Sequence, residues 1–208
     1  KLTTYFQQKV LRTDVLDGSG YGVEGVSVPP SAELRGYCEQ LVGRLSYTGV
    51  GCVQFLLDSR TGKAYFLEIN PRLDATCALP YRLGIDFPML AVECAKVRAG
   101  LVDADSVRLE QAQYQPGRRA AWIVGDIFGL LHAIRHRKVS APQVAAWVGR
   151  ICISVVRNRM HITWESRDPL PTVFLFGSRL KSLFSNIARL FRGRLAPHSR
   201  AENPRLAK

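Results

Sequence analysis

The sequence lacks several features that would place it in a specialised class. No apolar run approaches the roughly 18 residues that a membrane-spanning helix needs, and the chain opens on Lys1 without an initiator Met or a signal-peptide pattern. Its five cysteines are scattered and never form a C-x-x-C pair, which argues against a disulfide framework and a zinc site. We therefore expect a cytoplasmic globular protein whose thiols are small buried side chains.

Acidic residues are scarce, and most of them lie in the first part of the chain. The sequence has 29 Lys and Arg against 17 Asp and Glu, for a net charge of +12. Residues 1–117 hold 12 basic and 13 acidic side chains, whereas residues 118–208 hold 17 and 4. This asymmetry indicates two functional regions, of which the second can face an anionic partner.

Apolar periodicity and turn residues predict a mixed series of strands and helices. We expect strands over 4–13 and 21–28, a helix over 32–46 capped by Ser31, a β-hairpin over 51–70 and a helix that begins near Pro88. Farther along we expect strands over 107–114 and 120–128, then a helix, alone or followed by a strand, over 141–156. The G-x-G-x-x-G pattern at 20–25 leads into an extended segment rather than a helix, which favours a glycine-rich hairpin over a dinucleotide site.

The stretch FLEINPRLD, residues 66–74, places polar groups at the end of an apolar strand. On a strand, Glu68 and Asn70 share one face, together with Phe66. Folding the hairpin about its turn brings Gln54 opposite or next to Glu68. One carboxylate and two amide oxygens suit Mg²⁺ or Mn²⁺. The alternative is that these groups only satisfy the backbone of the following loop.

Two neighbouring residues extend this pattern toward nucleotide binding. Arg72, just past the strand, can contact a phosphate or a developing negative charge. Leu56 lies on the face of Gln54 and can form the floor of an apolar pocket for a base.

The segment YTGVGCVQFLLDSRTGKAYFLEINPRL, followed by LPYRLGIDFPMLAVECA, resembles the C-terminal half of an ATP-grasp domain. Gln54 and its spacing to Glu68 are similar to the large subunit of carbamoyl-phosphate synthase. The resemblance is strong over 46–98, weaker over 1–45 and absent beyond about 117. It implies that ATP and Mg²⁺ (or Mn²⁺) are the cofactors, with site residues that carry over by position. Gln54, Glu68 and Asn70 would hold the metal and the ATP phosphates, Arg72 and Lys9 would contact the transferred phosphoryl group, and Leu56 would lie beneath the adenine.

The resemblance implies an α+β fold, an ATP-grasp C-terminal lobe with an antiparallel sheet and flanking helices, plus a basic C-terminal extension. We expect this lobe over 1–117, an α/β extension over 118–178, and a basic amphipathic helix with a flexible tail over 179–208. The implied activity is that of a carboxylate–amine ligase, an ATP-dependent enzyme that forms C–N bonds through an acyl phosphate. Its substrates would be a small carboxylate and an amine or similar nucleophile. Because an ATP-grasp enzyme holds ATP between two lobes, we expect this chain alone to be an inactive fragment.

The alternative is a non-catalytic basic module that reuses the fold. The segment 179–194 has apolar residues on one face and basic residues off that face, a pattern typical of docking on its own domain or of lying on an anionic membrane surface. Peripheral membrane association thus stays open beside a cytoplasmic location. RNA is a weaker alternative partner, because no recognised nucleic-acid module accompanies the basic residues.

Overall fold

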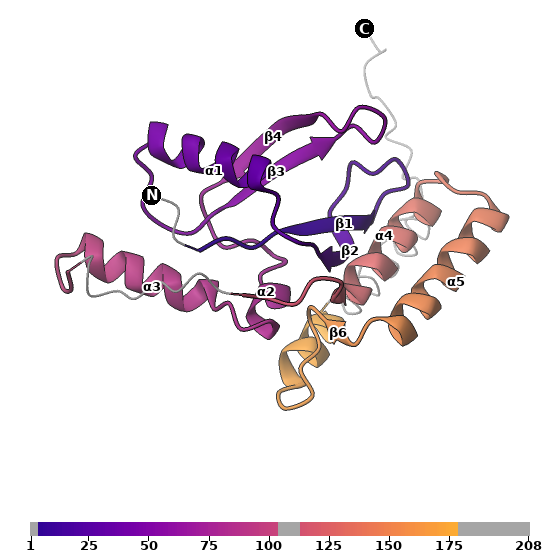
Figure 1. Cartoon of the computed structure of the whole chain (residues 1–208). Helices are drawn as coiled ribbons and strands as arrows, with labels where there is room; N and C mark the ends of the chain where they lie inside the picture. The colour runs from indigo at the N-terminus through magenta and orange to yellow at the C-terminus, as the bar shows by residue number, and fades with distance from the viewer. Residues whose placement is uncertain (1–3, 104–112, 179–208) are drawn as a thin grey trace, which may run out of the picture. The chain divides into compact units, whose positions relative to one another are not determined.

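The computed structural model describes residues 4–103 and 113–178 (Figure 1). The chain divides into two compact units, of which the first ends at Ile162 and the second begins at Thr163. The sequence places boundaries instead at 117 and 178, and the difference arises because strands on both sides of residue 117 pair in one sheet. No helix in the described ranges is both long and apolar enough to cross a membrane.

Four strands of the first unit form a mixed sheet in the order β1-β2-β5-β6. These are β1 (Gln8–Thr13), β2 (Gly22–Ser27), β5 (Arg119–Ala121) and β6 (Met160–His161). The pairs β1–β2 and β2–β5 are antiparallel, and β1–β2 confirms the predicted glycine-rich hairpin. The pair β5–β6, which lies beyond the predicted lobe over 1–117, is parallel. After β5 the chain passes through helices α4 and α5 and then places β6 beside β5. Parallel neighbouring strands require a crossover connection of this kind.

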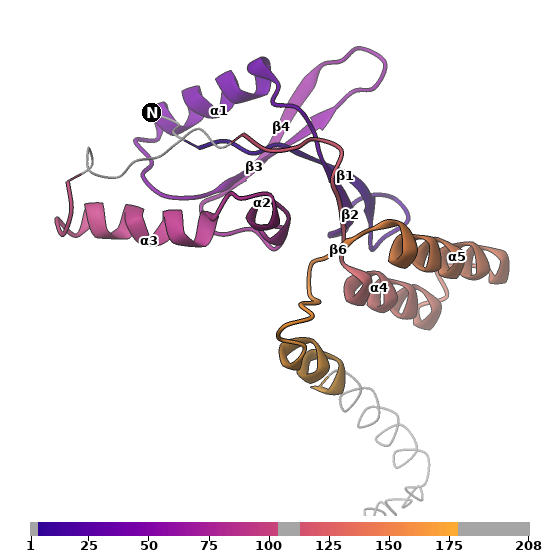
Figure 2. The ribbon, with the colours of Figure 1, turned by 60° about the horizontal axis from the view of Figure 1, so that its bottom comes forward.

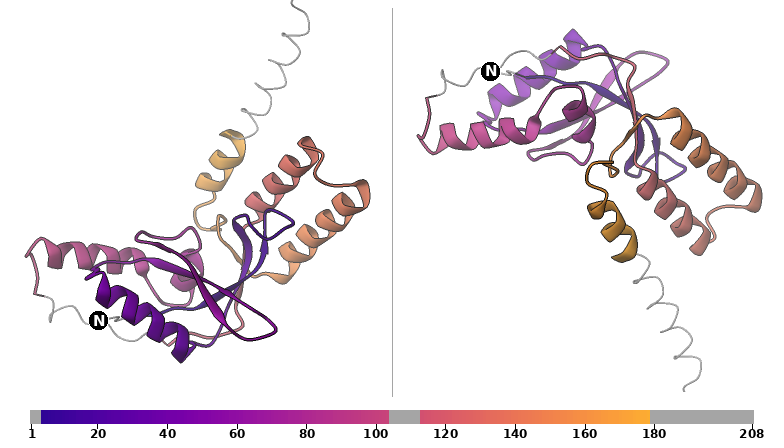
Figure 3. Two further views of the ribbon diagram at one scale, coloured as in Figure 1. Left: turned by 90° about the horizontal axis from the view of Figure 1, so that it is seen from above. Right: turned by 90° about the horizontal axis from the view of Figure 1, so that it is seen from below.

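A separate two-stranded sheet contains β3 (Cys52–Leu57) and β4 (Ala64–Asn70), which confirms the predicted hairpin. Helix α1 (Ala32–Arg44) begins at Ser31, whose side chain accepts a hydrogen bond from the backbone N–H of Leu34 as predicted. The ring of Tyr37 on this helix lies 6.2 Å from that of Phe55 on β3. The views from above and below show α1 running beside the hairpin (Figure 3). The helix therefore contacts one face of the two-stranded sheet.

Two helices follow the hairpin. The short α2 (Ala78–Arg82) contributes the buried Leu79, and α3 (Phe87–Arg98) begins where the sequence predicts a helix. Asp86 caps α3 by accepting a hydrogen bond from the N–H of Met89, and Pro88 lies in the first turn, where its missing N–H costs nothing.

Helices α4 (Ile123–Arg135) and α5 (Ala141–Arg157) form an antiparallel pair, visible side by side in Figures 1 and 2. Leu130 and Ala133 of α4 pack on Trp147 of α5. The predicted strand over 120–128 is therefore wrong beyond Ala121. A continuous apolar run cannot separate a strand from a buried helix, and here the helix is favoured because apolar side chains at helical spacing pack against α5. The helical alternative for 141–156 is confirmed.

In the second unit, residues 170–178 are helical, and the Thr172 hydroxyl donates to the Thr163 carbonyl. The predicted strand over 107–114 and the basic helix over 179–194 lie wholly or largely outside the described residues. The five cysteines are free. Cys38 is buried as expected, but Cys152 on α5 is exposed, so the expectation of uniformly buried thiols is wrong.

Candidate functional site

The hairpin brings the predicted oxygen ligands together. Gln54 lies directly opposite Glu68, and Cys52 directly opposite Asn70. Because directly opposed residues of an antiparallel pair project from the same face, Gln54, Glu68 and Asn70 occupy one face of the two-stranded sheet. The predicted register is confirmed.

A β-bulge at Leu67 changes one part of the expected arrangement. Gln54 pairs with Glu68 but the next residue, Phe55, pairs with Phe66, which leaves Leu67 without a partner across the hairpin. The rings of Phe55 and Phe66 lie 6.2 Å apart on the face that contacts α1. The expectation that Phe66 shares a face with Glu68 is therefore wrong, because the extra residue reverses the alternation between them.

Because of the bulge, the pair Phe55–Phe66 and the pair Gln54–Glu68 lie on opposite faces of the hairpin. Phe55 contacts Tyr37 of α1, whereas Gln54 and Glu68 lie on the opposite face of the hairpin. Both of these polar side chains are exposed. An exposed carboxylate beside amides, on the side free of α1, is accessible to a ligand from solution.

The donor set on this face fits a hard divalent cation. Asn70 Nδ2 donates to Glu68 Oε1 at 2.7 Å, so the two side chains already lie in contact. Rotation of the Asn70 amide would present its oxygen beside that carboxylate. One carboxylate and two amides match the few protein oxygens with which Mg²⁺ combines water and phosphates. Over the described ranges, no group of three or more His, Cys, Asp or Glu side chains gathers into a metal cluster.

Arg72 lies in the loop that leaves β4. Its guanidinium is exposed and donates to the Leu73 carbonyl at 3.1 Å, and its backbone N–H donates to the Asn70 carbonyl at 2.8 Å. Farther along the loop, the Thr76 hydroxyl donates to Asp74 and accepts from the side chain of Gln8 on β1. These bonds fix the loop to β1 while the Arg72 side chain faces solvent near the oxygen ligands.

The remaining predicted site residues lie as follows. Leu56 shares the face of Gln54 and is 58% exposed, so it forms an open apolar surface rather than a closed pocket. Lys9 is exposed on β1 and pairs with Val26 in the other sheet. Because Gln8 points toward Thr76 and strand side chains alternate, Lys9 points to the opposite face of β1. The structure thus groups five of the six predicted residues around β3, β4 and their exit loop and places Lys9 apart.

Comparison with known families bears directly on this hairpin. Residues 29–102 match the model of the carbamoyl-phosphate synthase L chain, ATP binding domain. The match supports membership of this segment in the ATP-grasp superfamily. No curated protein and no solved structure gives a significant match.

The ATP-grasp match contains the whole hairpin, the loop with Arg72, and helices α1 to α3. It supports ATP binding, a ligase type of function and small-molecule substrates. Lys9, β1, β2 and everything from β5 onward lie outside the matched residues.

The thiol of Cys52, directly opposite Asn70, lies close to the oxygen ligands of the hairpin. Burial, followed by the negative charges of Asp74 and Glu68, raises the pKa of the Cys52 thiol from 9.0 to about 11. Arg72 acts in the opposite direction. Burial is the largest of these causes, and the two carboxylates act in the same direction.

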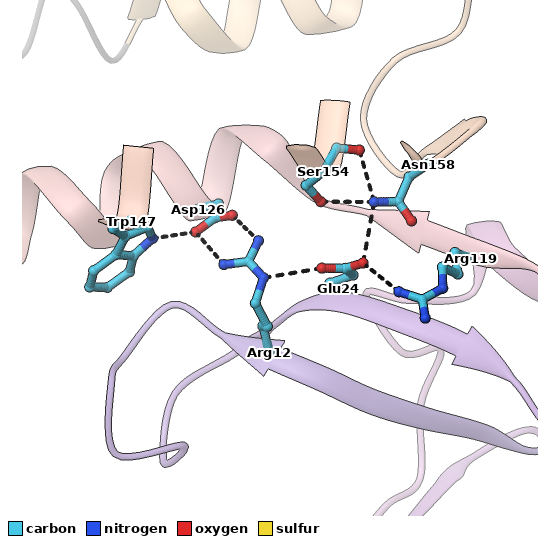
Figure 4. Close-up of polar contacts among 7 residues, drawn as sticks. All are labelled: Arg12, Glu24, Arg119, Asp126, Trp147, Ser154 and Asn158. Carbon is cyan, nitrogen blue, oxygen red and sulfur yellow. Dashed lines mark hydrogen bonds and ion pairs between the residues drawn. The ribbon is translucent and has the colours of Figure 1, made fainter. Parts of the chain in front are cut away.

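A second polar cluster, outside the ATP-grasp match, was not predicted from the sequence. Arg12 on β1 pairs with Glu24 on β2 at 3.1 Å and with Asp126 on α4 (Figure 4). Trp147 Nε1 on α5 donates to Asp126 Oδ1 at 2.6 Å. Arg119 on β5 pairs with Glu24 at 3.2 Å. The cluster attaches both helices to the four-stranded sheet.

Asn158 completes this cluster just beyond α5. Its Nδ2 donates to the Ser154 carbonyl and hydroxyl oxygens, each at 2.8 Å, and to Glu24 at 3.4 Å. Burial disfavours the ionised form of Glu24, but hydrogen bonds from Arg12 and Asn158 outweigh it and lower the pKa of this carboxyl. Glu24 is therefore ionised at neutral pH. The sequence signal was a charged residue at an inward position of a strand, which requires a partner.

Proposed function

We propose that the hairpin face is one wall of a Mg-ATP site in an ATP-dependent ligase that activates a carboxylate. Glu68, with Gln54 and Asn70, would hold Mg²⁺ or Mn²⁺ against the ATP phosphates. The observation that carries this proposal is the direct pairing of Gln54 with Glu68, with Asn70 bonded to Glu68, inside the ATP-grasp match. The metal, when bound, would neutralise charge on the phosphates.

The side chains of the chain itself would position and stabilise the reacting groups. Arg72 would donate hydrogen bonds to the transferred phosphoryl group, where charge is greatest in phosphoryl transfer. Leu56, exposed on the same face, would pack beneath the adenine. Lys9 is the weaker candidate for a phosphate contact, because its side chain leaves the opposite face of β1 from Gln8.

The reaction that we propose has two steps. A carboxylate oxygen of the substrate attacks the γ-phosphorus of ATP, which breaks the bond to the β-phosphate oxygen and yields an acyl phosphate and ADP. An amine then attacks the acyl carbon, phosphate leaves, and the amine loses a proton to give the C–N bond.

Manganese binding tests the metal assignment without requiring turnover. We expect the 208-residue chain to bind Mn²⁺ more tightly with ATP than without it, measured by water-proton relaxation. Glu68→Gln should weaken Mn²⁺ binding about tenfold or more, because one carboxylate supplies the only formal charge of the set. Glu39→Gln on α1 is the matched control and should bind as the wild type does. Equal affinities in the two variants would contradict the assignment.

Arg72→Gln separates phosphate contact from metal binding. This variant should bind Mn²⁺ alone with unchanged affinity and lose most of the enhancement by ATP, because the guanidinium would contact the nucleotide and not the metal. A loss of Mn²⁺ binding without ATP would show that Arg72 supports the structure of the hairpin instead.

A further inference from the structure

A basic groove lies between the four-stranded sheet and α5, outside the ATP-grasp match. Its volume is ≈ 300 Å³, which is at the lower end for small-molecule sites. Strands β1, β2 and β5 line one side and α5 lines the other. Its polar lining consists of four arginines, one carboxylate and one hydroxyl: Arg12, Arg119, Arg150, Arg157, Glu24 and Ser154.

The charges within the groove do not cancel. Arg12 and Arg119 are paired with Glu24, and Arg12 also with Asp126, so these two arginines and two carboxylates balance. In the described part of the chain, no carboxylate pairs with Arg150 or Arg157. The groove therefore carries an excess of two positive charges.

The spacing along α5 points these groups in one direction. Arg150, Ser154 and Arg157 are four and three residues apart, so they follow one face of the helix. Ser154 is buried, and its oxygen accepts a hydrogen bond from Asn158 Nδ2 at 2.8 Å. The hydroxyl hydrogen can therefore donate to an anion between the two arginines.

Glu24 does not oppose an anion strongly, because its carboxylate is already satisfied. It accepts hydrogen bonds from Arg12, Arg119 and Asn158. Leu11 and Ile153 add apolar surface to the same groove. The lining thus combines a fixed positive region with a hydrophobic one.

We propose that this groove binds the phosphate group of a small organic phosphate ester, with its carbon skeleton against Leu11 and Ile153. A phosphate monoester carries a charge of about −1.5 to −2 at neutral pH, which matches the excess on Arg150 and Arg157. Planar guanidinium groups match phosphate oxygens in two-pronged hydrogen bonds. The site is independent of the hairpin, because none of its residues lies within 29–102.

Calorimetric titration of the 208-residue chain with phenyl phosphate, at constant ionic strength in chloride, tests the proposal. We expect saturable binding that is tighter than that of inorganic phosphate, because only the ester has an apolar part. Arg150→Gln and Arg157→Gln should each weaken it about tenfold or more. Arg98→Gln, which removes an exposed arginine from the end of α3, should leave the affinity unchanged. Circular dichroism would verify that each variant is folded.

Two results would overturn the proposal. The first is the absence of saturable binding by the wild type, or wild-type affinity in both α5 variants. The second is a loss of phenyl phosphate binding in Arg98→Gln as large as that in the α5 variants, which would show a response to net charge and not to the groove. Failure of the manganese experiment leaves these expectations unchanged, so the two proposals are tested separately.

Discussion

Asp126 has a buried carboxylate, and its replacement should strongly lower the stability of the first unit. It is 1% exposed and accepts hydrogen bonds from Trp147 Nε1 and from both terminal nitrogens of Arg12. Replacement by Asn preserves the shape and removes the charge. In either orientation of the Asn amide, the new NH₂ group faces a hydrogen-bond donor, because the side chains of Arg12 and Trp147 only donate. One hydrogen bond therefore becomes a donor–donor contact.

The expected cost follows from these contacts. Breaking a buried ion pair by removing one partner costs about 3–5 kcal/mol. Because Glu24 remains to pair with Arg12 at 3.1 Å, we expect the lower end of that range, about 3 kcal/mol. This is a large fraction of the roughly 5–15 kcal/mol by which domains are stable. It corresponds to a fall in Tm of roughly 6–12 °C for a chain of this size.

Urea unfolding followed by tryptophan fluorescence measures this cost for Asp126→Asn. Glu39→Gln is the matched control, since Glu39 also pairs with an arginine, Arg35 at 3.2 Å, but on an exposed helix surface. That variant should lose less than about 0.5 kcal/mol. In a double-mutant cycle, Asp126→Asn combined with Trp147→Phe should cost less than the sum of the single changes. A loss below about 1 kcal/mol, or equal losses in Asp126→Asn and the control, would refute the assignment.

Three further predictions concern packing, pH and thiol reactivity. Gly129→Ala on α4 should destabilise the protein, because the new Cβ would lie 2.5 Å from the Asp14 carbonyl oxygen. Gly149→Ala on α5, where nothing lies within 4 Å of the new Cβ, should stabilise the protein by about 0.5–1 kcal/mol. Thermal melts that rank the two variants in the reverse order would contradict this. Because the pKa of Glu24 is lowered, its contribution to the free energy of unfolding is fully present above its unfolded pKa of about 4.3 and is lost as pH falls through the folded pKa. Urea midpoints should therefore fall more steeply in acid for the wild type than for Glu24→Gln. Parallel curves for the two proteins would contradict this. Because the pKa of Cys52 is about 11, iodoacetamide at pH 8 should label the exposed Cys152 well before Cys52, and mass spectrometry showing equal labelling would contradict this order.

The sequence was sufficient to predict the hairpin because its information is local. The turn at 59–62 and the alternation on both sides placed Gln54 opposite or next to Glu68, and in the structure the two lie directly opposite each other. The bulge at Leu67 was not predictable, because its sequence continues the alternation and the contacts of Phe55 with Phe66 and with Tyr37 of α1 form only in the folded chain.

Helix α4 and the buried cluster could not be predicted for a different reason. The run at 120–128 is apolar apart from Asp126, so periodicity did not separate a strand from a helix. Arg12 and Asp126 are 114 positions apart, and no local pattern connects them. Such pairs become visible only when the fold brings β1, β2 and α4 together.

In the described part of the region after residue 117, the buried cluster keeps one carboxylate away from solvent. That region has four acidic residues, Asp126, Glu165, Asp168 and Glu202. Asp126 is 1% exposed and is paired with Arg12 from β1, so it offers almost no negative charge to solvent. Arg150 and Arg157, farther along the same region, therefore act in a positive field that the nearest carboxylates do not reduce. The ion pairs that attach α4 and α5 to the sheet thus also leave the groove beside α5 with the charge that a phosphate requires.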